Sequence, residues 1–408
     1  MPSLDDADVG RKGSAAEVFL AFLKLGVTAF GGPVAHIGYF RHEFVERRRW
    51  LDDATYADLV ALCQFLPGPA SSQVGLALGA RRAGPLGALA AWVGFTLPSA
   101  LLMILAGWGA VAFGTDDPVA SATIHGLKLV AVAVVAQAVR QMAGRLAADR
   151  AHATILVAAA TIALTLPGLA GQLGAIALGV VAGLVAGRLH DGSPSGAAGP
   201  LAIHVPVPVG LALLATLLVL LAAPLLVAVP EFLRIAEAAF RAGALVFGGG
   251  HVVLPLLEAD TVQTGLVGRD AFLAGYGLAQ AVPGPLFTFA AFLGTAAPLP
   301  GGITGGLLAV TAVFVPSALI LFGVLPFWDR LRAWEPARRA LDGVNAAVVG
   351  LLVAVLYDPV ATAAITGAPD VAAILVAYLL LEIWKAPPWA VVVGFGAAGA
   401  ALALAGAA

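Results

Sequence analysis

Two basic residues inside apolar segments are the first candidates for chemistry. Lys24 lies in Ala16–His36 and Arg241 at the matching place in Phe232–Pro255, and each precedes a Phe-Gly-Gly run by the same spacing. A cation in an apolar helix is costly to bury and usually faces a cavity or a partner. The matching positions predict an anion site near an axis that relates two halves of the chain. Snorkelling, or pairing of Arg241 with Glu237, is the structural alternative.

Two Pro-Gly-Pro loops form the second set of candidates. A half-helix that starts after such a loop points free N–H groups and its positive dipole end into the protein, which suits an anion. Hydroxyl groups follow both loops and glutamines precede them, although helix kinking and tight packing of small residues are the structural alternative. The candidates are Gln64, Pro67, Gly68, Pro69, Ser71 and Ser72 in the first half, and Gln280, Pro283, Gly284, Pro285 and Thr288 in the second.

Further candidates are weaker. The glycine runs Gly31-Gly32 and Gly248-Gly249 allow close backbone approach. Lys128 lies in an apolar helix, and its counterpart in the second half is Asn345. Histidines titrate near neutral pH, which makes His36 and His251 candidates for proton coupling, although most such histidines only satisfy hydrogen bonds.

These residues belong to a chain that repeats itself. Phe-Gly-Gly, Gln-x-x-Pro-Gly-Pro, Pro-Ser-Ala-Leu and a Gly-x-Lys/Asn triplet recur in the second half, in the same order and with nearly unchanged spacing. Paired, interrupted hydrophobic segments in two halves indicate a secondary transporter and mark its binding site.

Composition places the chain in a membrane. Hydrophobic residues make up 60% of it and charged residues 11%, against about 25% charged in soluble domains. Several stretches carry few or no charged residues and have about the length that spans a bilayer. They are Gly84–Thr115, Val205–Pro230 and Pro387–Ala408. We expect an all-α polytopic membrane protein. A net charge of −2 argues against a nucleic-acid partner, and the single cysteine, Cys63, excludes an internal disulfide.

The expected domains are a polar tail (1–15), a first repeat (16–189), a Gly/Ser/Pro-rich linker (190–204) and a region (205–408) with an extra span, the second repeat and two final spans. Basic loops lie in the cytoplasm. They follow the first and second segments of repeat one but the third segment of repeat two, which predicts two repeats of inverted topology. Three spans separate the fourth segment from the second repeat, where an even number is expected.

The second segment, 54–79, has basic loops on both sides and Pro-Gly-Pro near its middle. It therefore reads as a re-entrant hairpin that returns to the cytoplasm, with its turn buried in protein. Asp52, Asp53 and Asp58 could hold Mg²⁺ for a lipid diphosphate, but such enzymes need a second acidic cluster and none is present. Helix capping is the favoured interpretation for Asp52 or Asp53. Sequence motifs for a metal, cofactor or ATP are absent.

At these motifs the chain resembles the chromate ion transporter (CHR) family, in its long two-repeat form. The resemblance rests on Phe30–Pro33, Gln64–Pro69 and Phe95–Ser99, each repeated in the second half, and covers most of 17–355. It implies a multi-pass protein of the bacterial inner membrane that exports chromate, a sulfate analogue, and confers chromate resistance. Coupling would be to the membrane potential, a proton gradient or another oxyanion. Gly250-His251 replaces the proline of the first glycine run, so the halves need not bind an anion identically.

We therefore expect a transporter rather than an enzyme, binding a tetrahedral oxyanion without a cofactor and working by rocking of one repeat against the other. The alternatives are a passive anion channel and an intramembrane Mg²⁺-dependent enzyme acting on a lipid diphosphate. The expected partners are the oxyanion and the lipid bilayer, with a homodimer left open.

Overall fold

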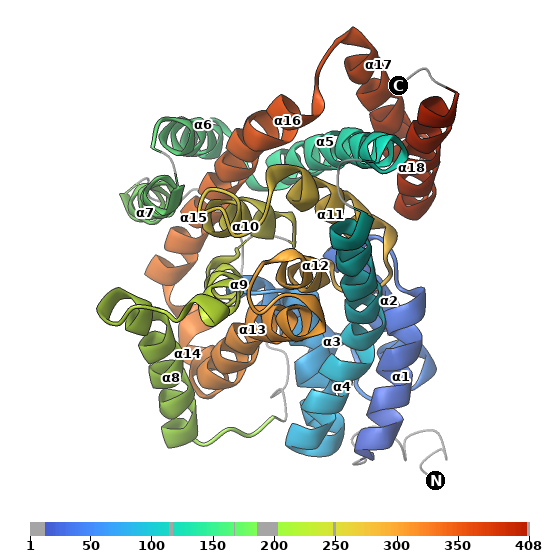
Figure 1. Ribbon diagram of the computed structural model, residues 1–408. Coiled ribbons are helices and arrows are strands. Elements are labelled where there is room, and N and C mark those ends of the chain that lie inside the picture. Colours follow the sequence, from blue (N-terminus) through green and yellow to red (C-terminus); the bar gives the residue numbers. More distant parts are fainter. Residues whose placement is uncertain (1–12, 114–116, 167, 186–202, 248–249, 406–408) are drawn as a thin grey trace.

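The computed structural model describes residues 13–113, 117–166, 168–185, 203–247 and 250–405, and these residues form helices without any strand (Figure 1). Five helical stretches among them are long and apolar enough to cross a membrane. They contain α4 (Ala70–Phe113), α5 (Pro118–Leu146), α8 (Val207–Leu226), α13 (Gly302–Val324) and α15 (Glu335–Val355). The expected all-α polytopic membrane fold is confirmed.

The first apolar segment folds back on itself instead of running straight. Helix α1 (Ala15–Thr28) ends before Gly31, whose φ of +98° is open to glycine but strained for other residues, and α2 (Gly32–Arg41) begins directly after it. An ion pair of 3.8 Å joins Lys24 on the first limb to Glu43 beyond the second. The segment predicted as one broken helix is therefore a hairpin.

The second half contains the same hairpin. Helix α9 (Arg234–Leu245) and helix α10 (Val253–Thr261) are joined by Arg241 and Asp260, at 2.8 Å. Glu43 and Asp260 occupy corresponding positions of the two repeats, just as Lys24 and Arg241 do, so the cross-limb ion pair is repeated. Because a hairpin begins and ends on one side, an odd number of crossings between the repeats, rather than the even number expected, would invert the second repeat. Of the three helices there, Val207–Leu226 is long and apolar enough to span, and the other two are shorter apolar helices.

The second segment is also a hairpin. Helix α3 (Asp53–Phe65) leads to the first Pro-Gly-Pro loop, and α4 then runs back until it reverses sharply at Ala83 and Gly84. The carboxylate of Asp52, at the start of α3, interacts electrostatically with Arg81, at the end of the returning limb, so the two ends of the hairpin lie near each other. In the second half α11 (Arg269–Ala281), the second loop and α12 (Phe289–Ala296) take the same path.

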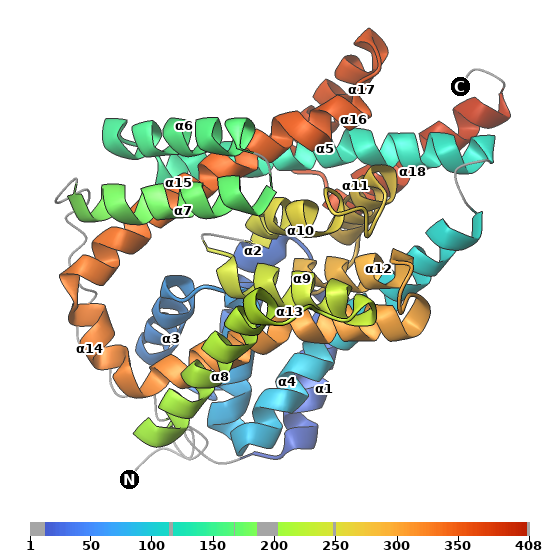
Figure 2. The same cartoon turned by 60° about the vertical axis from the view of Figure 1, so that its left-hand side comes forward.

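The last two helices of each half are exchanged between the halves. Helices α6 (Arg150–Thr165) and α7 (Gly168–Val185) pack on α15, whereas α17 (Ala368–Tyr378) and α18 (Pro388–Leu404) pack on α5 (Figure 1). Figure 2 shows the first pair lying along α15. Each hairpin therefore covers the long helix of the other half.

Glycines bring these exchanged helices into backbone contact. A Cβ on Gly343 of α15 would lie 2.1 Å from the carbonyl oxygen of Gly179, and one on Gly126 of α5 would lie 2.3 Å from that of Phe395. Gly126 and Gly343 are the repeated glycines of the Gly-x-Lys/Asn triplet. The fourth repeated motif thus serves the packing of the exchanged hairpins.

The long helices α5 and α15 run in opposite directions. Arg145, at the end of α5, lines one pocket with Asn345, in the middle of α15. At the other end Lys128 of α5 pairs with Asp270 at 2.9 Å, and the neighbouring Arg269 pairs at 3.7 Å with a residue just after α15, Asp358. This antiparallel arrangement agrees with the inverted repeats inferred from loop charge.

Short helical turns complete the fold. They are η2 (His42–Arg47), η3 (Glu231–Leu233), η4 (Gly250–Val252), η5 (Leu286–Thr288), η6 (Leu325–Phe327), α14 (Trp328–Ala333), η7 (Leu356–Ala361), α16 (Thr362–Ala364) and η8 (Leu379–Ile383). The polar tail lies mostly outside the described residues, as does most of the linker.

Candidate functional site

The two Pro-Gly-Pro loops are bound to the opposite half of the chain. The N–H of Gly68 donates to the carbonyl of Val246, at 2.7 Å, and the N–H of Gly284 donates to the carbonyl of Ala29, at 2.9 Å. Both acceptors lie directly before a Phe-Gly-Gly run. The loops and the breaks of the first segments, predicted separately as candidates, therefore meet at the interface between the repeats.

Each loop glycine also lies against a serine of the opposite half. A Cβ on Gly68 would be 3.0 Å from Ser317 Oγ, and a Cβ on Gly284 would be 2.9 Å from Ser99 Oγ. Both glycines have positive φ, +120° and +96°. Ser99 and Ser317 are the serines of the repeated Pro-Ser-Ala-Leu motif, so this motif lines the same interface.

The half-helix after the first loop brings polar groups into the interior. Ser71, Ser72 and Gln73 are buried in the first turn of α4, and the amide of Gln73 donates to the carbonyl of Pro67 at 2.8 Å. His36, with none of its surface exposed, lies 3.5 Å from Ser71 Oγ through Nδ1. The first candidate loop is thus surrounded by buried polar side chains.

Several polar atoms here have no hydrogen-bond partner among the described residues. Buried polar groups are normally satisfied, so an unsatisfied group indicates a ligand, an ion or water. The atoms are His36 Nε2, Ser72 Oγ, Gln73 Oε1, Thr96 Oγ1 and Ser317 Oγ. We call Gly68, Ser71, Ser72, Gln73, His36, Phe95, Thr96, Ser99, Gly284 and Ser317 the central cluster. It combines hydroxyl donors with the free N–H groups of a helix start, and it contains no charged residue.

Phe95 joins the two sides of the central cluster. The ring of His36 packs edge-on against the ring of Phe95, with centroids 5.1 Å apart, and a Cβ on Gly284 would lie 3.1 Å from the carbonyl oxygen of Phe95. Ser99 donates to the carbonyl of Thr96 at 3.0 Å. The polar turn of α4 and the second loop are therefore neighbours through one aromatic residue.

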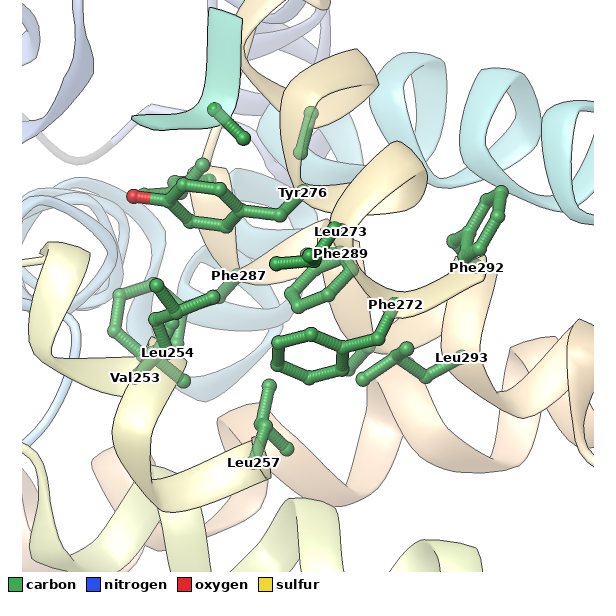
Figure 3. Packing of buried hydrophobic residues seen from close by; sticks show 14 of the residues in the cluster. Val253, Leu254, Leu257, Phe272, Leu273, Tyr276, Phe287, Phe289, Phe292 and Leu293 are labelled. Atoms are coloured by element: carbon green, nitrogen blue, oxygen red, sulfur yellow. The ribbon is translucent and has the colours of Figure 1, made fainter. Parts of the chain in front are cut away.

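The second loop has an apolar surrounding. Phe287 and Phe289 occupy the positions of Ser71 and Gln73, and Figure 3 shows them within a buried aromatic group with Tyr276. The hydroxyl of Thr288 donates to the carbonyl of Pro285 at 2.9 Å. The polar side of the interface accordingly comes from repeat one, as the excess of hydroxyls after its loop suggested.

The three candidate cations are already paired with carboxylates. Lys24 is half-exposed beside Glu43, Arg241 binds Asp260, and Lys128 binds Asp270. These pairs join helix limbs or neighbouring helices. Direct contact of Lys24, Arg241 or Lys128 with an anion stays a prediction.

The remaining candidates are dispersed. Gly31 and Gly32 form the first break, and a Cβ on Gly250 would lie 3.0 Å from Pro33. Gly248 and Gly249 lie outside the described residues. His251 bonds the hydroxyl of Tyr276 at 2.7 Å.

Outside the interface, Gln64 is exposed on α3, whereas Gln280 near the second loop has a buried amide nitrogen without a partner among the described residues. Asn345 lines a cavity of about 130 Å³ with Arg145, Asp149 and His152.

The acidic residues near 52–58 have structural partners. Asp52 accepts the N–H of Thr55 at 2.8 Å as the N-cap of α3, and this bond lowers the pKa of its carboxyl group. Asp53 pairs with Arg41 at 2.7 Å. Asp58 lies 3.3 Å from Arg332. Each of the three carboxylates thus has a partner within the protein, and Asp52 caps a helix as one of the two residues predicted to do so.

Sequence reasoning missed Gln73, Thr96, Ser99 and Ser317. The repeated Pro-Ser-Ala-Leu motif was a signal for the two serines, but nothing in the sequence tells that it faces the loop of the other half. Gln73 and Thr96 have hydrophobic counterparts in repeat two, so symmetry did not mark them.

Alanine at Gly68 or Gly284 is expected to lower transport at least about tenfold while the protein still folds. Positive φ costs a non-glycine residue about 1–2 kcal/mol, and the added Cβ would press on Ser317 or Ser99 across the interface. Gly265→Ala is the matched control, because Gly265 also has positive φ (+75°) but an open surrounding. Equal transport in all three variants, measured per folded molecule in vesicles, would contradict a role of the interface.

Comparisons with known proteins agree with one another. The family model described as "Chromate transporter" matches residues 16–187 and 233–400. The chromate transport protein of Pseudomonas aeruginosa is 31% identical over 85% of this chain and 81% of its own length. That of Cupriavidus metallidurans is 28% identical over 82% and 80%.

A shorter relative matches one part of the chain. The uncharacterized transporter YwrB of Bacillus subtilis is 34% identical over 84 residues, which are 21% of this chain and 43% of YwrB, so YwrB is about half as long. No solved structure matches the chain.

Proposed function

Since this chain belongs to the chromate transporter family, we propose that it exports chromate, or a related tetrahedral dianion such as sulfate, from the bacterial cytoplasm by alternating access. Its place would be the inner membrane, and its activity would confer chromate resistance. Chromate transport itself is what the names of its relatives describe.

One observation carries the proposed site: the central cluster holds buried hydrogen-bonding atoms without partners among the described residues, at the interface of two inverted repeats. A tetrahedral oxyanion offers four acceptor oxygens. The hydroxyls of Ser72, Thr96 and Ser317 and the first N–H groups of α4 are donors that such a ligand would satisfy. Because the cluster lacks a cation, we propose that oriented dipoles hold the dianion there.

Burial of the central cluster supports alternating access. His36, Gln73 and Ser317 expose none of their surface, so an anion reaches them only when helices part. The exchanged hairpins tie the long helix of each repeat to the other repeat. We therefore propose that the re-entrant hairpins move against a scaffold of α5, α15 and the exchanged pairs, in place of the simple rocking expected from the sequence.

Export is the direction that the membrane potential favours. Moving one charge across 100 mV is worth about 2.3 kcal/mol, so a dianion leaving a negative cytoplasm gains about 4.6 kcal/mol. Arg47 and Arg48, both on the side assigned to the cytoplasm, are shared with buried Glu43. We propose that this basic loop helps to gather the anion at the cytoplasmic mouth.

The function is tested by chromate uptake into inside-out membrane vesicles. Vesicles that contain a carrier and are preloaded with unlabelled chromate should transiently accumulate labelled chromate above its outside concentration. Vesicles that contain a passive channel cannot do so. No uptake beyond that of vesicles lacking the protein would contradict chromate transport, and uptake without counterflow would establish the channel.

Removing a hydroxyl from the central cluster is expected to weaken chromate binding by about 10- to 100-fold. A hydrogen bond to a charged group contributes about 1.5–3 kcal/mol, and Ser72 and Ser317 each have an uncommitted buried oxygen. The half-saturating concentration of uptake should rise for Ser72→Ala and Ser317→Ala. The control is Ser121→Ala, on the exposed first turn of α5. If all three variants matched the wild type, the site would lie elsewhere.

A further inference from the structure

One buried carboxylate differs from all the others in the described part of the chain. Glu43, Asp260, Asp370 and Glu382 each lie within 4 Å of a basic side chain. Glu258, only 4% exposed, has the neutral amide of Gln263 as its recorded side-chain partner, at 2.9 Å. A carboxylate that loses water without gaining a cation is driven towards its protonated form.

Charged groups surround Glu258 at longer range. Ionisable side chains lie on its own helix, on the elements packed against it, or close enough to act on it through space. They are Arg234, Glu237, Arg241, His251, Asp260, Arg269 and Asp358, with Glu335, Arg338, Arg339 and Asp342 in the first turns of α15. Arg241 is held by Asp260 and Arg269 by Asp358. The α15 group lies at the opposite end of that helix from Asp358. Arg241 and Arg269 are thus already shared with other acids.

Repeat symmetry does not explain this residue. The counterpart of Glu258 in the first repeat is Arg41, an exposed cation that binds Asp53 and Glu46. The fold therefore accepts a surface cation at this position and does not need a buried acid. A departure from symmetry towards the costlier residue points to function.

The position of Glu258 connects it to the central cluster. It lies on α10, the returning limb of the second hairpin. The turn that leads into α10 begins at Gly250, which lies beside Pro33 of the first repeat. A Cβ on Gly250 would also lie 3.6 Å from Leu286, which directly follows the second Pro-Gly-Pro loop. The stretch from Gly250 to Glu258 covers about 12 Å of helix, so one short segment joins Glu258 to that loop. At an effective dielectric constant of about 20, a carboxylate about 12 Å from a dianion weakens the binding of that dianion on the order of 100-fold.

We propose that Glu258 binds a proton together with the transported anion and releases it when the anion leaves. The inference rests on the proposed function. The carboxylate takes up H⁺ as the dianion enters, so the pair moves with a net charge of −1 in place of −2. By linkage, the anion raises the proton affinity of Glu258 as much as the proton raises the affinity for the anion.

The test compares the wild type with Glu258→Gln in proteoliposomes between pH 6 and 9. Glutamine imitates the protonated acid. The wild type should bind chromate at least about tenfold more weakly than Glu258→Gln at the alkaline end and equally well at the acidic end. Chromate changes its own protonation in this range, but identically for both proteins. Glu258→Asp should keep the pH dependence, and Glu231→Gln, at an exposed carboxylate, should behave as the wild type.

Two results would overturn the proposal. One is a pH profile common to the wild type and Glu258→Gln. The other is weaker binding of Glu258→Gln at every pH, which would make the residue structural. Infrared spectroscopy gives a second readout: chromate added at alkaline pH should increase a protonated carboxyl band in the wild type and in Glu231→Gln but not in Glu258→Gln, and an increase in Glu258→Gln would also overturn the proposal. Absence of wild-type counterflow would instead refute the proposed function.

Discussion

Valine at Gly343 is expected to prevent the protein from accumulating in folded form. The added Cβ would lie 2.1 Å from the carbonyl oxygen of Gly179 and 2.8 Å from the backbone nitrogen of Gly183. Both neighbours are backbone atoms of one helix, so α7 as a whole must move away from α15. Overpacking destabilises the folded state by about 1–3 kcal/mol and occasionally more. A contact with backbone atoms, which cannot rotate away, is expected at the upper end of that range.

The yield of monodisperse protein after detergent extraction, with its thermal stability, measures this effect. A drop of at least about tenfold is expected, since each 1.4 kcal/mol is about a factor of ten. Gly394→Val on α18 is the matched control, because a Cβ there meets nothing within 4 Å. Normal yield of Gly343→Val would show that the exchanged hairpin is not held by this contact.

Alanine at Arg241 is expected to destabilise the protein by about 3–5 kcal/mol, because it leaves the buried carboxylate of Asp260 without its partner. Restoring neutrality in Arg241→Ala/Asp260→Asn should recover most of the loss in thermal stability. Lys24→Ala is the matched control from the other repeat. It should cost less than about 1 kcal/mol, because Lys24 is half-exposed and Glu43 keeps Arg47 and Arg48.

The same variants test whether the two cations touch the anion directly. If both were ligands of the dianion, Lys24→Ala and Arg241→Ala would lose chromate uptake equally, irrespective of stability. If they are ties between helix limbs, only Arg241→Ala loses uptake strongly, and the double variant regains it. Failure of Arg241→Ala/Asp260→Asn to regain either stability or uptake would contradict the role of a tie.

Local sequence signals predicted much of the fold. The basic loops around 54–79 and its Pro-Gly-Pro turn indicated a re-entrant hairpin, and α3 with the first limb of α4 has that path. The first two of the three segments expected between the fourth segment and the second repeat correspond to helices α6 and α7. These features depend on nearby residues and on which loops are charged, and both can be read along the chain.

Long-range contacts could not be predicted in the same way. Ala16–His36 looked like one broken helix, because the same glycines can produce either a kink or a full reversal of the chain. Only the ion pair between Lys24 and Glu43 distinguishes the two. The exchange of α6–α7 with α17–α18 depends on which glycine faces which backbone, and sequence spacing does not contain that information. For the cations, only the pairing of Arg241 with Glu237 one turn away was considered, and it is present at 3.1 Å. The carboxylates on the opposite limbs, Glu43 and Asp260, could not be identified from sequence spacing.

The exchanged hairpins have a consequence for biogenesis. The ribosome completes α5 long before it makes α17 and α18, which cover α5 through the contact of Gly126 with Phe395. During that interval the face of α5 around Gly126 lacks the backbone contact that α18 supplies. A chain that ended after such a first half would lack this contact unless a second polypeptide supplied it.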